Sequence, residues 1–144
     1  MKLIKPSAQI IEPTGYTIDD IYKSIELAGR VSHKSEANIK EGSAKDFVGR
    51  MLNMKHLATC EFGTVYLHAH SMYDLDIEKY RQNPYSKAVW KNNGHYISTN
   101  YRTLVENNWL DDLKYLCEPT ECYEKRYTVK FILDRAISHK EFVA

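Results

Sequence analysis

The sequence has no long apolar run, and it is poor in cysteine and glycine. Its apolar runs are as short as Phe131-Ile132-Leu133, whereas about 20 residues are needed to span a bilayer. Residues 1–6 carry neither the apolar core nor the small-residue cleavage site of a signal peptide. We therefore expect no transmembrane segment and no secretory leader.

The cysteines are three, an odd number without the spacing of a disulfide framework: Cys60, Cys117 and Cys122. The last two lie across a turn at Pro119, and no second pair exists to complete a zinc knuckle. Free thiols are typical of reducing compartments, so this count predicts a cytoplasmic protein.

The sequence also has no marked excess of positive or negative side chains. The 20 Lys and Arg residues nearly balance the 19 Asp and Glu residues, which leaves a net charge of +1. This balance gives no electrostatic reason to bind nucleic acid or an anionic membrane. With six glycines, and without a P-loop, a dinucleotide fingerprint, a G-x-S-x-G elbow or an H-E-x-x-H helix, the chain carries no standard phosphate-binding, hydrolase or metalloprotease motif.

What is present is the patterning of one α+β domain over residues 1–144. Apolar residues make up 43% of the chain, which is enough to fill a core. Thr17 opens a helix with a capping box, and Ser43 is expected to cap a second helix. Residues 71–94 have few organising signals and predict a long loop or an insertion. Periodicity predicts strands over 2–11, 61–70, 96–98 and 126–133, and helices over 17–32, 43–52, 100–106 and 109–117.

The end of the sequence reads as the start of a helix. The segment Ser138-His139-Lys140-Glu141 has the capping-box pattern, apolar residues follow it, and the sequence stops at Ala144. One helical turn is marginal in water, because nucleation costs more than a few hydrogen bonds return. The pattern therefore predicts a polypeptide that has been cut short.

Four side chains are candidates for a site, each with a structural alternative. His56 and Glu61 flank the expected corner between the second helix and the next strand, where they either meet a ligand or form a solvated turn. Arg30 ends the first helix, where it either grips a phosphate or only complements the helix dipole. Arg135 follows the 126–133 strand, at a strand end of the kind that often binds ligands.

His68 and His70 form an H-x-H pair on one face of an expected strand. Some metal sites use this spacing, but no third ligand is evident, and strand histidines usually contact neighbouring strands. We therefore expect no metal. None of the three cysteines lies by a base and an orienting group, so we also assign no catalytic nucleophile.

Four segments, taken in their order along the sequence, resemble segments of a known protein family. They are 27–32 (LAGRVS), 43–56 (SAKDFVGRMLNMKH), 56–62 (HLATCEF) and 127–139 (YTVKFILDRAISH). In this order they resemble the flavin-dependent thymidylate synthases. The ordered match extends over most of the chain, and residues 71–125 resemble an insertion typical of one branch of that family.

The resemblance implies an antiparallel sheet flanked by helices, assembled as a homotetramer. It also implies an activity in dTMP biosynthesis. NADPH reduces bound FAD, and a methylene group from methylenetetrahydrofolate is placed on dUMP to give dTMP. The chemistry is a flavin hydride transfer without a cysteine nucleophile, so the cofactor carries the difficult step and the protein positions the reactants.

The same resemblance assigns roles to individual residues. It implies flavin contacts for His56, Thr59, Glu61 and Arg30. The chain departs from the family pattern beside two of them: Ala58 occupies the place of the family's Thr, one position before Thr59, and Phe62 replaces the family's second His. For the substrate, the resemblance implies contacts from Arg135 and Glu141.

The family's Arg-His-Arg signature does not occur in the 144 residues. The resemblance places it where Ala144 stands, after a lead-in of residues 141–143, with Lys140 as an extra residue between His139 and Glu141. It therefore predicts the N-terminal part of such an enzyme, without thymidylate synthesis of its own. Two alternatives stay open: a non-catalytic module that associates with itself or with a full-length paralogue, and a plain α+β domain with accidental similarity.

Overall fold

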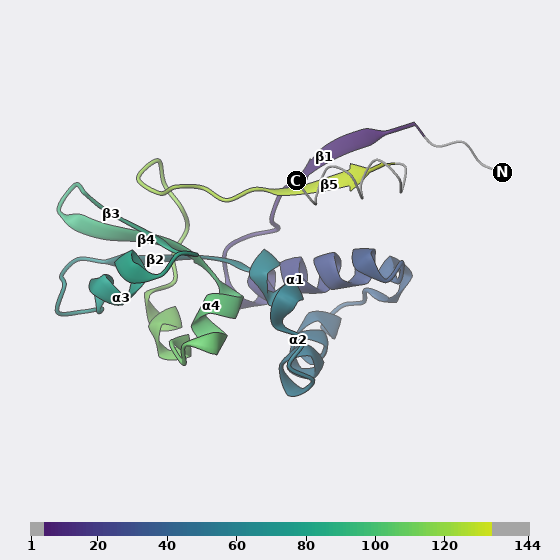
Figure 1. The fold of residues 1–144 in the computed structure, drawn as a ribbon, viewed down its shortest axis with the longest axis horizontal. Coiled ribbons are helices and arrows are strands. Elements are labelled where there is room, and N and C mark those ends of the chain that lie inside the picture. The colour runs from purple at the N-terminus through teal and green to yellow at the C-terminus, as the bar shows by residue number, and fades with distance from the viewer. Residues whose placement is uncertain (1–4, 134–144) are drawn as a thin grey trace. The chain divides into compact units, whose positions relative to one another are not determined.

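The computed structural model describes residues 5–133, and within them it shows helices and two antiparallel sheets (Figure 1). The predicted α+β class is therefore confirmed. The strands are β1 (Ser7–Ile11), β2 (Thr64–Ala69), β3 (Lys87–Lys91), β4 (Gly94–Asn100) and β5 (Thr128–Ile132). The α-helices are α1 (Ile18–Ser32), α2 (Ser43–Asn53), α3 (Ile77–Gln82) and α4 (Tyr101–Glu106). Short 3-10 helices are η1 (Glu36–Asn38), η2 (Leu57–Phe62) and η3 (Leu110–Tyr115).

The chain divides into two compact units. The larger unit spans Pro13–Arg126 and holds most of the elements. The smaller unit combines the two ends of the chain, up to Glu12 and from Tyr127 onward, and holds β1 and β5. In the part of the chain that the structure describes, no helix combines the length and apolar content that crossing a bilayer requires.

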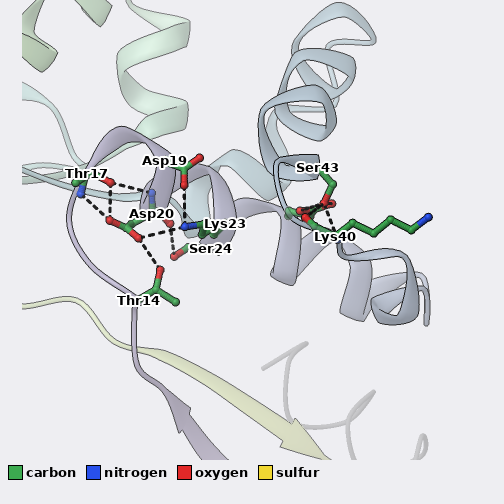
Figure 2. Close-up of polar contacts among 9 residues, drawn as sticks. Thr14, Thr17, Asp19, Asp20, Lys23, Ser24, Lys40 and Ser43 are labelled. Carbon is green, nitrogen blue, oxygen red and sulfur yellow. Dashed lines mark hydrogen bonds and ion pairs between the residues drawn. The ribbon is translucent and has the colours of Figure 1, made fainter.

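Helix α1 begins as its sequence predicts. Thr17 is the N-cap: its Oγ1 accepts from the backbone N–H of Asp20 at 3.3 Å, and Oδ2 of Asp20 accepts from the backbone N–H of Thr17 at 3.1 Å (Figure 2). The hydroxyls of Thr17 and Thr14 also donate to this carboxylate, and together these bonds hold the pKa of Asp20 below its ordinary value. The predicted capping box is confirmed.

The expected role of Ser43 as the cap of α2 is wrong. Gly42, in the left-handed region at a φ of 77°, is the N-cap, and Ser43 is the first helical residue. The Oγ of Ser43 instead lies 2.9 Å and 2.8 Å from the two carboxylate oxygens of Glu26 on α1. A buried carboxylate requires donors, and the local sequence around Ser43 contains no sign of this distant acceptor.

Strand β4 is the centre of a three-stranded antiparallel sheet in the order β2-β4-β3. Ile97 on β4 lies opposite Leu67 on β2 and Ala88 on β3, so these side chains share one face of the sheet. Leu67 and Ile97 are fully buried, and they belong to the same apolar core as Tyr80 of α3. The sheet and α3 are thus held together by one apolar face.

Residues 71–94 are not the long loop that their polar composition suggested. They contain α3 and β3, because three apolar residues anchor the segment: Leu75, Ile77 and Tyr80 are 3%, 4% and 0% exposed. The expected 96–98 strand is correspondingly longer and pairs on both sides as β4.

Two other elements differ from the prediction, one in where it begins and one in its type of helix. The strand expected over 61–70 begins at Thr64, because η2 occupies the residues before it and buries Cys60 completely. The helix expected over 109–117 is the 3-10 helix η3. The helices expected at 17–32, 43–52 and 100–106 are confirmed.

Strands β1 and β5 form a two-stranded antiparallel ribbon, which confirms the strands predicted near both ends of the described residues. Ala8 lies opposite Phe131, and Ile10 lies opposite Val129, so these four apolar side chains share one face. The helix start expected at residue 138 lies outside the described residues.

Three helices end on a residue other than glycine in the left-handed region: Lys34 after α1 (φ 51°), Lys55 after α2 (φ 57°) and Asn108 after α4 (φ 59°). After α1, the N–H of Lys34 bonds to the carbonyl of Val31 at 3.2 Å, and that of Ser35 bonds to Arg30 at 2.9 Å. This is the Schellman motif, which glycine usually completes. A lysine there stores about 1 kcal/mol of backbone strain.

We expect Lys34→Gly to raise the free energy of unfolding by about 0.5–1 kcal/mol, because it relieves that strain. The matched control is Lys45→Gly in the first turn of α2, which should lower the same quantity by about 0.5–1 kcal/mol. Urea unfolding followed by circular dichroism measures both. If Lys34→Gly destabilises the protein as much as the control does, the strain is absent.

Candidate functional site

The residues with expected flavin contacts at positions 56–61 lie on one corner of the larger unit, between the end of α2 and the start of β2. Lys55 ends α2 in the left-handed conformation, and the N–H of His56 bonds to the carbonyl of Met51 at 2.9 Å. Helix η2 follows at once and packs against α1, α2 and α4. Three helices therefore hold this corner, which we call the 56–61 corner.

Cys60 and Gly63 anchor the 56–61 corner to its surroundings. The Cys60 side chain is fully buried, and the N–H of Tyr101 donates to the carbonyl of Gly63 at 2.8 Å. A Cβ on Gly63 would lie 2.7 Å from Cδ1 of Ile25 and 2.8 Å from Cγ2 of Ile21. Only glycine lets the backbone pass this close to α1, so core packing fixes the path of the corner.

His56, Thr59 and Glu61 differ in their environments. His56 is exposed, whereas the Oγ1 of Thr59 is buried and has no hydrogen-bond partner within residues 5–133. Glu61 Oε2 lies 3.5 Å from Nη1 of Arg102, and their side chains are 44% and 39% exposed. Arg102 also bonds to Glu106 at 2.9 Å, and this nearer carboxylate is the main cause that raises the pKa of the guanidinium.

Arg30 has a carboxylate partner within its own helix. Its Nε and Nη2 donate to Oε1 of Glu26 at 3.1 Å and 2.9 Å, one helical turn earlier. Glu26 is 1% exposed, and the Arg30 side chain is 14% exposed. The guanidinium also lies over the Phe47 ring, 5.1 Å from its centroid. A ligand at Arg30 would have to compete with Glu26 or use Nη1 alone.

Thr59 lies beside the turn of α1 that carries Arg30. A Cβ on Gly29 would be 3.5 Å from Cγ2 of Thr59 and 2.5 Å from Cζ of Phe47. The structure thus brings Thr59 to the end of α1, while the charged group of Arg30 faces Glu26. The two expected substrate contacts, Arg135 and Glu141, lie outside the described residues.

His68 makes aromatic contacts on the sheet. It stacks on its cross-strand neighbour Tyr96 at 4.7 Å between ring centroids, and its edge contacts His70 at 4.5 Å. Burial lowers the pKa of His68, whose Nε2 has no partner in this part of the chain. Across residues 5–133, no three His, Cys, Asp or Glu side chains are grouped so that they could hold a metal ion.

The thiols of Cys60 and Cys117 are held in their neutral form. Burial raises the pKa of both, and for Cys117 it outweighs the hydroxyl of Tyr123, which lies 2.7 Å from Sγ and lowers the pKa. A nucleophilic cysteine requires a lowered pKa, so neither environment favours nucleophilic chemistry.

Three polar contacts were not predicted: Glu26 with Arg30, Glu26 with Ser43, and Arg102 with Glu61. The Glu26–Arg30 pair has the i,i+4 spacing of helical ion pairs, so that contact was detectable in the sequence. The contacts of Ser43 with Glu26, and of Arg102 with Glu61, join distant parts of the chain and left no local signal.

Comparisons with protein-family models, with curated proteins and with solved structures return no match to this chain. The assignment of a function therefore depends on the ordered segments and on the geometry of the 56–61 corner.

We expect Arg30→Met to lower the free energy of unfolding by about 3 kcal/mol, because it leaves the Glu26 carboxylate buried without its cation. The double variant Glu26→Leu with Arg30→Met should regain most of this loss. Chemical denaturation measures each value.

The control is Lys23→Met, which removes an exposed ion pair with Asp19 and should cost less than about 0.5 kcal/mol. A loss for Arg30→Met no larger than that of the control would contradict the structural role of Arg30 and leave it available for a ligand.

Proposed function

We propose that this chain binds FAD at the 56–61 corner, as a relative of the flavin-dependent thymidylate synthases. The ordered segments motivate the family, and one structural observation supports the place: the hydroxyl of Thr59 is buried at the corner without a partner. Buried polar groups are nearly always hydrogen-bonded, so an orphaned hydroxyl is a natural position for a ligand atom or a bound water.

The corner suits the ring end of a flavin better than its phosphate end. His56 offers an exposed imidazole, and Glu61 with Arg102 offers an exposed acceptor and donor. The isoalloxazine ring has polar edges that such groups recognise, and it supplies the hydride chemistry when bound. Arg30, the cation at this end of α1, already binds Glu26, so it supplies little charge for phosphates.

The proposed activity of the family needs more residues than the corner. In this proposal, dUMP would be held by Arg135 and Glu141, while NADPH and methylenetetrahydrofolate serve as co-substrates in the cytoplasm. Since no Arg-His-Arg triplet occurs in the 144 residues, we propose that this polypeptide alone binds flavin without converting dUMP to dTMP.

The substitution Thr59→Val tests the FAD proposal, because it replaces the orphaned hydroxyl by a methyl group of similar shape. Without flavin, it should raise the free energy of unfolding by about 1 kcal/mol, since an unsatisfied buried group is removed. With flavin, it should weaken FAD binding about three- to tenfold, since a hydrogen bond to the ligand is lost.

Quenching of FAD fluorescence measures the binding, and riboflavin serves as a second ligand that lacks phosphates. We expect similar affinities for both flavins, a weaker one for His56→Ala, and no change for the exposed control His33→Ala. A folded wild-type protein that binds neither flavin would refute the proposal.

A second candidate function is self-association through the β1–β5 ribbon, as a non-catalytic module. A two-stranded ribbon is marginally stable in water, and one face of this ribbon is apolar. Three apolar side chains on that face are exposed: Ile10 (53%), Val129 (40%) and Phe131 (51%). Exposed apolar patches of this kind favour association, either with a second copy or with a paralogue.

We expect the wild-type protein to form oligomers that Phe131→Lys disrupts, because a charge on the apolar face must be desolvated on contact. Gln9→Lys introduces the same charge on the opposite face of the ribbon and should leave association unchanged. Sedimentation velocity over a range of concentrations measures both. A wild-type monomer at all concentrations excludes this second function.

A further inference from the structure

The stretch from Lys79 to Val105 contains no Asp or Glu, although the chain as a whole is nearly neutral. Most of its cations have acidic partners: Lys79 pairs with Asp112 at 2.5 Å, Arg81 with Glu78 at 3.7 Å, and Arg102 with Glu61 and Glu106. The remaining two are Lys87 and Lys91, at the two ends of β3. Within residues 5–133, neither of them forms an ion pair.

Among the strands of residues 5–133, β3 is an edge of its sheet, and no described strand pairs with its outer side. A two-residue turn at Asn92 and Asn93, with φ values of 48° and 59°, joins it to β4. Such a turn closes on a hydrogen-bonded pair, here Lys91 and Gly94, and these pairs alternate along an antiparallel ladder.

The backbone N–H and C=O groups that bond to β4 are therefore those of Lys87, Val89 and Lys91. The groups of Ala88 and Trp90 point outward. In the described part of the chain, no further backbone bond engages Ala88 or Trp90.

The side chains of β3 give this edge a distinct character. Trp90 is 54% exposed, and one side of its indole contacts His95 at 4.5 Å between ring centroids. Lys87 and Lys91 are exposed and lie on the opposite face of the sheet from Trp90. The edge thus combines free backbone groups, one apolar anchor and two unpaired cations.

We propose that the outer edge of β3 binds an acidic, extended segment of a partner protein, which adds to the sheet as a fourth strand. Strand addition of this kind derives affinity from backbone hydrogen bonds and specificity from alternate side chains. Carboxylates at alternate positions of the partner would meet Lys87 and Lys91, and an apolar residue between them would cover Trp90.

Charge selects this partner over a second copy of the chain. Two β3 edges paired antiparallel about Val89 would bring Lys87 of each copy opposite Lys91 of the other, and like charges directly opposite are destabilising. Lysines on an edge strand commonly protect it from such pairing. A single-stranded nucleic acid would be attracted by the same lysines, but it would leave the outward backbone groups of Ala88 and Trp90 unused.

A synthetic peptide of about six residues, a typical strand length, tests this proposal. It alternates glutamate with valine or threonine and carries a fluorescent label, and its control has lysine in place of glutamate. Fluorescence anisotropy should show binding of the acidic peptide only, weakened by added salt. Hydrogen exchange should show new protection of the amides of Ala88 and Trp90, which are the outward donors.

Two variants probe the two parts of the edge. The pair Lys87→Glu with Lys91→Glu should weaken peptide binding about tenfold or more, because it reverses both charges. The matched pair Lys34→Glu with Lys45→Glu makes the same change of net charge elsewhere and should leave binding unchanged. Ala88→Pro removes one outward donor without removing a bond to β4, and it should also weaken binding about tenfold.

Several results would overturn the proposal. They are equal binding of the acidic and basic peptides, no binding of the acidic peptide, and binding without protection of Ala88 and Trp90. Preferential binding of labelled oligothymidylate, or dimerisation that the Lys87 and Lys91 variant abolishes, would assign the edge to another partner and equally overturn it. These outcomes are independent of flavin binding at the 56–61 corner.

Discussion

The larger unit depends on one buried carboxylate. Glu26 is almost fully buried on α1, and it receives hydrogen bonds from Arg30 one turn later and from Ser43 at the start of α2. A charge in this position is tolerated only with its donors in place, so the contact fixes how α1 and α2 meet. Helix η2 packs on both helices, so the positions of Thr59 and the rest of the 56–61 corner follow from that one contact.

Elements with strong local signals were predictable from the sequence. The capping box at Thr17 and the alternation over 126–133 each specify their structure within a few residues, and both are present. The stretch 71–94 was missed because its apolar residues keep neither a helical nor an alternating period long enough to mark α3 or β3. Their burial against the β2–β4 sheet determines the structure, and that contact is not a local property.

In the candidate site, too, contacts between residues close in sequence were predictable, and contacts between distant residues were not. The resemblance selects His56, Thr59 and Glu61, and the structure places them on one tightly packed corner. It also gives Arg30 a partner, Glu26, that the resemblance did not imply. The i,i+4 spacing of Glu26 and Arg30 was readable in the sequence, whereas the bond from Ser43 to Glu26 joins residues on different helices and was not.

The two proposals place different functions on the 56–61 corner and on the segment 71–125. Residues 71–125 supply α3, β3 and the central strand β4. Strand β4 also pairs with β2, which follows the corner and begins at Thr64, so β3 and β4 extend the sheet away from the corner. A partner strand on β3 would be separated from β2 by two strands, β4 and β3. In the two proposals, a protein partner at the edge of β3 would therefore bind without any change in the residues that would contact a flavin.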